Sequence, residues 1–69
     1  MELHINGEKR RFSQSETINV SDLLDALAVE QRRGLAVAIN ERVIPKSRWS
    51  EFLVNDGDAV EIIRATQGG

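Results

Sequence analysis

The stretch ELHINGEKRRFS (residues 2–13) decides how this chain begins to fold. Polar and apolar residues alternate from Glu2 to Ile5, which is the period of a strand with one buried face. Asn6 and Gly7 follow, and both tolerate the positive φ angles of a two-residue type I′ turn. A return strand over 8–13, with Phe12 pointing inward, completes a predicted β-hairpin.

A helix is predicted after the polar, turn-like segment 13–17. Its apolar stripe has helical spacing and consists of Val20, Leu23, Leu24, Leu27 and Ala28. Ser21 is the expected N-cap, and the helix is expected to run roughly from Asp22 to Val29. Gly34 is the expected C-terminal stop, with Arg32 and Arg33 near the negative end of the helix dipole.

The second half predicts further strands. Residues 35–40 alternate larger and smaller apolar side chains, so the larger ones should face the helix while Ala36 and Ala38 line the outer face. A turn at 41–42 leads to a short strand over 43–44, which Pro45 ends because it has no N–H to donate. A short helical turn over 46–50 should follow.

The segment 55–58 is a turn signal, and the closing strand spans 59–64. Alternation points Val60 and Ile62 inward and Ile63 outward. The order of elements predicts an α+β domain with one helix packed on a mixed sheet of four to five strands. The first and last strands are expected to be parallel neighbours at its centre.

Length and composition exclude several classes of function. The 69 residues predict one domain, with a globular body over 1–64 and a flexible tail over 65–69. The absence of cysteine excludes disulfides and thiolate metal sites, and together with the lack of a signal peptide it favours a cytoplasmic location. The net charge of −2 argues against nucleic acid, and no apolar run is long enough to span a membrane.

No side chain suggests catalysis. His4, the only histidine, is predicted to face solvent, and no metal site is expected. Asp56 and Asp58 flank Gly57, and turn chemistry explains them better than acid–base catalysis does. Trp49 fits a core residue better than an interface anchor. The basic run over 9–11 is predicted to be a solvated edge, with a docking role as the less favoured alternative.

The final residues, Gly68 and Gly69, fit either a frayed end or a functional one. A glycine thread can pass through a channel too narrow for other residues, and residues 65–69 span about 16 Å when extended. Ordering them would cost about 5–10 kcal/mol of backbone entropy. A docking face on the body would offset that cost, and the outward Ile63 beside Ala36 and Ala38 is the predicted face.

The chain resembles the β-grasp, ubiquitin-like sulfur carriers, and most closely the ThiS-type carriers of thiamin biosynthesis. The likeness runs over nearly the whole chain. It is carried by the opening hairpin, the helix signature over 20–24, the AVAIN run over 36–40, Val43-Ile44-Pro45, Trp49, the DGD turn over 56–58 and the final Gln67-Gly68-Gly69. The resemblance implies that Gly69 carries sulfur, while Thr66, Gln67 and Gly68 thread into partner sites.

The implied chemistry takes place on the main chain. An E1-like adenylyltransferase of the ThiF type would use ATP and magnesium to convert the Gly69 carboxylate to an acyl-adenylate. Sulfur relayed from a cysteine desulfurase would then leave a thiocarboxylate, which donates sulfur to a ThiG-type thiazole synthase. On this reading the chain is not an enzyme, and it binds no cofactor of its own.

Three alternatives stay open. The small subunit of molybdopterin synthase has the same fold and tail chemistry, but it resembles this chain less around 40–49. A ubiquitin-like modifier joined to lysines shares the activation step. A binding module with an irrelevant tail is the third.

Overall fold

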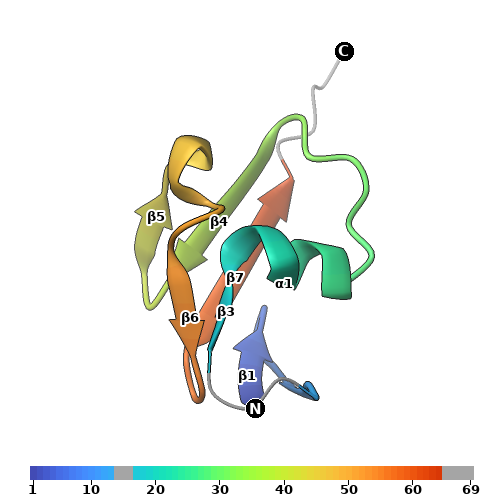
Figure 1. The fold of residues 1–69 in the computed structure, drawn as a ribbon, viewed down its shortest axis with the longest axis vertical. Helices are drawn as coiled ribbons and strands as arrows, with labels where there is room; N and C mark the ends of the chain where they lie inside the picture. The colour runs from blue at the N-terminus through green and yellow to red at the C-terminus, as the bar shows by residue number, and fades with distance from the viewer. Residues whose placement is uncertain (14–16, 65–69) are drawn as a thin grey trace.

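The computed structural model describes residues 1–13 and 17–64. A five-stranded sheet with the order β2-β1-β7-β4-β5 forms one layer (Figure 1). Its strands are β1 (Glu2–Ile5), β2 (Glu8–Arg11), β4 (Leu35–Ile39), β5 (Arg42–Ile44) and β7 (Ala59–Arg64). β7 is the central strand, and it pairs in parallel with its neighbour β1. The other pairs in this sheet are antiparallel. The predicted mixed sheet and its parallel central pair are confirmed.

Helix α1 (Val20–Ala26) covers one face of this sheet (Figure 1). The predicted N-cap at Ser21 is wrong. Asn19 caps the helix, because its Oδ1 accepts the Asp22 N–H at 2.7 Å. The backbone N–H of Val20 donates to the Phe52 carbonyl, and that of Ser21 donates to the Trp49 carbonyl. These tertiary contacts satisfy the first N–H groups and start the helix earlier than expected.

The predicted helix end near Val29 and stop at Gly34 are also wrong. The helix closes at Leu27, and Ala28 takes the left-handed conformation with φ 60°. Its N–H donates to the Asp25 carbonyl, while the Val29 N–H donates to the Leu24 carbonyl at 2.9 Å. This pattern is a Schellman motif, in which an alanine occupies the position that glycine usually takes.

A second, two-stranded sheet was not predicted. It pairs β3 (Thr17–Asn19) with β6 (Leu53–Asn55), and Ile18 lies opposite Val54.

The predicted helical turn after Pro45 is confirmed as a 3-10 helix, η1 (Lys46–Arg48). The turn predicted at 41–42 is displaced by one residue. Asn40 and Glu41 form it with φ 50° and 70°, and Arg42 begins β5.

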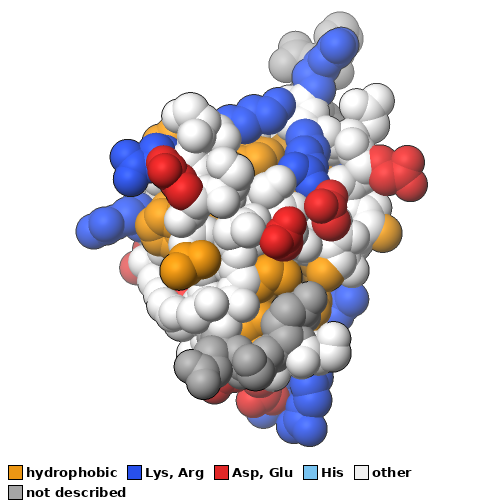
Figure 2. All heavy atoms as spheres, in the orientation of Figure 1, with side chains coloured by type: hydrophobic (Ala, Val, Ile, Leu, Met, Phe, Trp, Pro, Cys, Tyr) orange, Lys and Arg blue, Asp and Glu red, His pale blue; other side chains and the backbone are white. Residues whose placement is uncertain are grey.

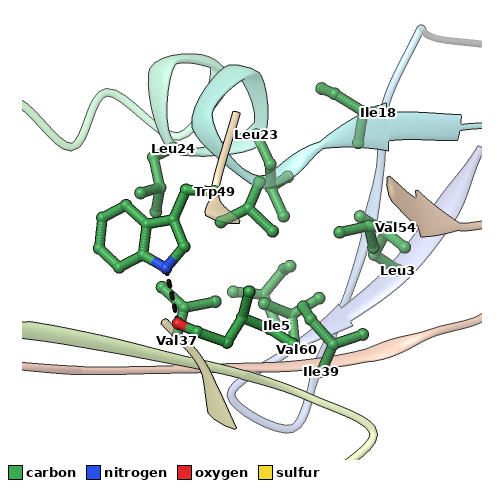
Figure 3. Packing of buried hydrophobic residues seen from close by; sticks show 12 residues of the cluster. Leu3, Ile5, Ile18, Leu23, Leu24, Val37, Ile39, Trp49, Val54 and Val60 are labelled. Carbon is green, nitrogen blue, oxygen red and sulfur yellow. Dashed lines mark hydrogen bonds between the residues drawn. The ribbon is translucent and has the colours of Figure 1, made fainter. Parts of the chain in front are cut away.

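The core lies between the large sheet and α1 (Figure 3). Its buried members are aliphatic except for one tryptophan: Leu3, Ile5, Ile18, Val20, Leu23, Leu24, Val37, Ile39, Ile44, Trp49, Val54 and Val60. Trp49 is 3% exposed, and its indole N–H donates to the Ile44 carbonyl at 2.8 Å. The prediction of a core role for Trp49 is confirmed, and this bond ties the segment after η1 to the edge strand β5.

Candidate functional site

The candidate site lies where β7 ends at Arg64. The predicted sulfur-carrying and threading residues, Thr66, Gln67, Gly68 and Gly69, lie outside the described residues. What the structure describes is the strand that leads to them and the surfaces beside it. β7 is the middle strand of the large sheet, so it has strand neighbours on both sides.

Two asparagines fix β7 along its length. Asn6, in the first hairpin turn, accepts the Ile62 N–H through Oδ1 at 2.8 Å and donates to the Ile62 carbonyl at 3.2 Å. Asn40, in the second turn, accepts the Ala59 N–H through Oδ1 at 3.0 Å. Both turns have positive φ angles that asparagine adopts more readily than most residues. The two hairpin turns therefore hold the strand that leads to the predicted tail.

An apolar patch covers part of the outer face of the sheet. Ala36 lies opposite Ile63, and Ala38 lies opposite Val43, so strand pairing brings all four side chains to one face. We call Ala36, Ala38, Val43 and Ile63 the outer-face patch. Ile63 is 58% exposed and Val43 is 68% exposed. The predicted outward orientation of Ile63 is confirmed.

The patch differs from the prediction in two members. Ala38 lies on the expected face but is only 8% exposed, so it contributes little surface that a partner can reach. Val43 was not predicted. Its exposure follows from pairing with Ala38, and locating the turn at 40–41 is the step that reveals this pairing. Ala36 is exposed, as expected.

The end of β7 is joined to the segment that follows α1. The Arg64 guanidinium donates to the Gln31 carbonyl at 2.9 Å. The next residue, Arg32, donates to Ser21 Oγ at 2.9 Å and forms an ion pair with Asp25 at 2.5 Å. Arg32 therefore anchors this segment to the helix, and the segment in turn supports the last residue of β7.

The side chains for which the sequence predicted no catalytic role are His4, Asp56 and Asp58. His4 is exposed, as predicted. Asp58 accepts the Asn55 N–H at 2.8 Å and a bond from Asn40, while Asp56 accepts the Glu2 N–H at 2.6 Å. Over residues 1–13 and 17–64 no group of three or more potential ligands could hold a metal ion. In the same described part of the chain, no helix is long and apolar enough to cross a membrane.

Comparison with known proteins decides the family. The model of the ThiS family matches residues 3–69. The chain belongs to the ThiS family. A crystal structure of a ThiS thiamine biosynthesis protein from Geobacter metallireducens superposes with a TM-score of 0.89, at 36% sequence identity and with full coverage of both chains. The predicted β-grasp fold is therefore confirmed.

Two curated relatives of this ThiS-family chain carry functional names. The sulfur carrier protein ThiS of Escherichia coli (strain K12) is 28% identical over 69 residues, which span all of both chains. A protein named thiazole synthase, from Paramagnetospirillum magneticum, is 45% identical over 69 residues. The chain spans only 20% of the length of that thiazole synthase.

Proposed function

We propose that this protein is the sulfur carrier of thiamin biosynthesis and that the main-chain carboxylate of Gly69 carries the sulfur. The observation that carries the proposal is the family match, which extends through Gly69. The full-length match to the Escherichia coli carrier supports the same position. A carboxylate is a poor electrophile, so the proposed chemistry needs activation before sulfur can replace oxygen.

The proposed activation is an adenylation by an E1-like partner, which would hold ATP and magnesium. The carboxylate oxygen attacks the α-phosphorus of ATP, and pyrophosphate leaves. The terminal sulfur of a persulfide, supplied through a cysteine desulfurase, then forms the C–S bond as AMP leaves. A thiol cleaves the remaining S–S bond, and the thiocarboxylate stays on Gly69.

The proposed acceptor is thiazole synthase. A protein of that name contains a stretch matching this whole chain, which supports a working relationship between a carrier of this kind and that enzyme. In this proposal the outer-face patch docks each partner while the tail enters its active site. Ile63 and Ala36 supply accessible apolar surface beside the end of β7, and Val43 extends it.

Intact mass spectrometry tests the proposal. The protein is incubated with its adenylating partner, ATP and a persulfide donor, and a mass gain matching the replacement of one oxygen by sulfur is expected. The variant lacking Gly69 is expected to stay unmodified while keeping its stability, because the buried core is built from residues 3–60. No gain with a partner that modifies the Escherichia coli carrier would contradict the proposal.

A deletion strain separates the thiamin pathway from molybdenum cofactor synthesis. The proposal expects growth to be restored by thiamin or its thiazole precursor. Restoration that instead depends on the molybdenum cofactor would favour the molybdopterin synthase subunit.

A further inference from the structure

Exposed cations gather at the end of the domain where β7 finishes. Arg64 lies opposite Leu35, the residue at which β4 begins, so Arg33 is close in the chain to this end. Ile44 lies opposite Val37, and the chain beyond it carries Lys46 back toward the start of β4. Arg33, Lys46 and Arg64 are all exposed, and we call them the cationic end. Figure 2 shows Lys and Arg side chains around the upper part of the molecule, where β7 finishes in Figure 1.

The other end of β7 carries acidic side chains. Asp56 and Asp58 lie in the turn that precedes β7. Glu41 lies in the turn between β4 and β5. Its neighbour Asn40 joins the two turns through hydrogen bonds to Asp58 and Ala59. Glu41 and Asp56 are exposed, and Asp58 is half-buried. Exposed Arg42, opposite Ile39, and Arg11, opposite Glu2, also lie near this end, so acids and cations are mixed at the start of β7.

Formal charges quantify the difference between the region of the cationic end and the rest of the chain. The segments 30–34 and 45–51, with Asp25 and Arg64, carry five cationic and three acidic side chains, a net charge of +2. The whole chain has a net charge of −2, so the remainder carries −4. Two of the five cations have acidic partners within the domain, since Arg32 pairs with Asp25 and Arg48 pairs with Glu51 at 3.0 Å. The three residues of the cationic end have no acidic partner among the ion pairs of the described residues.

We propose that the cationic end docks against an acidic rim around the active-site opening of the adenylating partner. This inference rests on the proposed function. An acidic rim attracts the cationic end, so the domain approaches with the finish of β7 foremost. Complementary charges of this kind raise association rates and select orientation more than they add affinity.

The charge pattern favours a protein surface over nucleic acid as the partner. A phosphate backbone requires a concentrated positive face, whereas this chain is acidic overall and its exposed cations are spread over the cationic end with Arg48, over β2, and over Arg42 on β5. The remaining exposed cations on β2 also provide an internal comparison. Arg10 and Arg11 lie on the opposite edge strand of the sheet, away from β4 and β5.

Two charge-reversed variants test the proposal. Arg33→Glu/Lys46→Glu alters the cationic end, and Arg10→Glu/Arg11→Glu alters β2, so both variants reach the same net charge. The measurement is pyrophosphate release by the adenylating partner as a function of carrier and salt concentration. We expect kcat/KM of the first variant to fall at least about tenfold at low salt, through KM, with kcat unchanged. The β2 variant should lose less than about twofold.

The difference between the two variants should shrink as salt rises, because salt screens exposed charges. Equal losses in both variants, or a loss independent of salt, would overturn the proposal. Thermal unfolding checks that both variants fold. If either is destabilised, the neutral pairs Arg33→Gln/Lys46→Gln and Arg10→Gln/Arg11→Gln replace them. The difference in kcat/KM between these two variants should be smaller but in the same direction. Failure of the proposed function looks different, since wild-type protein would then support no pyrophosphate release.

Discussion

Replacing Ile63 with aspartate tests whether the outer-face patch docks a partner. Ile63 is 58% exposed, so the domain itself covers about two fifths of the side chain. Full burial of an isoleucine is worth about 1.5–3 kcal/mol, so Ile63→Asp should lower the free energy of unfolding by roughly 0.6–1.3 kcal/mol. A partner that covers the rest gains roughly 0.9–1.7 kcal/mol, which is about 4- to 18-fold in affinity.

The expected result is therefore a rise of about tenfold in the KM for this carrier, with only a modest loss of stability. Pyrophosphate release measures the first quantity and urea unfolding measures the second. Leu53→Asp is the matched control, because Leu53 is 54% exposed but lies on β6, outside the large sheet. An equal rise in KM for both variants would refute the assignment of docking to the patch. A stability loss above about 3 kcal/mol in Ile63→Asp would contradict the surface position of its side chain.

Two further predictions concern stability, both measured by urea unfolding. Ala28→Gly should raise the free energy of unfolding by about 0.5–1 kcal/mol, because Ala28 holds a φ of 60° that glycine adopts without a Cβ clash. A decrease would show that glycine's greater backbone entropy outweighs the relieved strain. Trp49→Phe should cost about 1–3 kcal/mol or more, because the buried Ile44 carbonyl loses its indole N–H donor. Unchanged stability would mean that this carbonyl gains another donor.

Alternation and turn chemistry predicted the strands of the large sheet, but the ends of α1 depend on contacts distant in sequence. Asn19 and Ser21 are equally good N-caps by residue type. The choice is made by the Phe52 and Trp49 carbonyls, which accept the backbone N–H groups of Val20 and Ser21. The N-cap therefore lies two residues earlier than predicted. No local pattern contains that information.

The same limit applies to the candidate site. Alternation along β7 was sufficient to place Ile63 on the outer face. Val43 was missed because the turn was placed at 41–42 instead of 40–41, and its second residue, Glu41, is an unusual residue type for a positive φ. The first residue of the turn, Asn40, is held in place by its side chain, which donates to Asp58 and accepts the Ala59 N–H.

These observations separate presentation from chemistry in the proposed carrier. β7 is paired on both sides and bonded by Asn6 and Asn40, so Ala36 and Ile63 of the patch have fixed positions relative to Arg64, the last described residue. Substitutions in the patch and the cationic end should then change how readily a partner receives the tail, which appears in KM. Changes at Gly69 should abolish the reaction at any carrier concentration, because no higher occupancy of the partner replaces the reacting carboxylate.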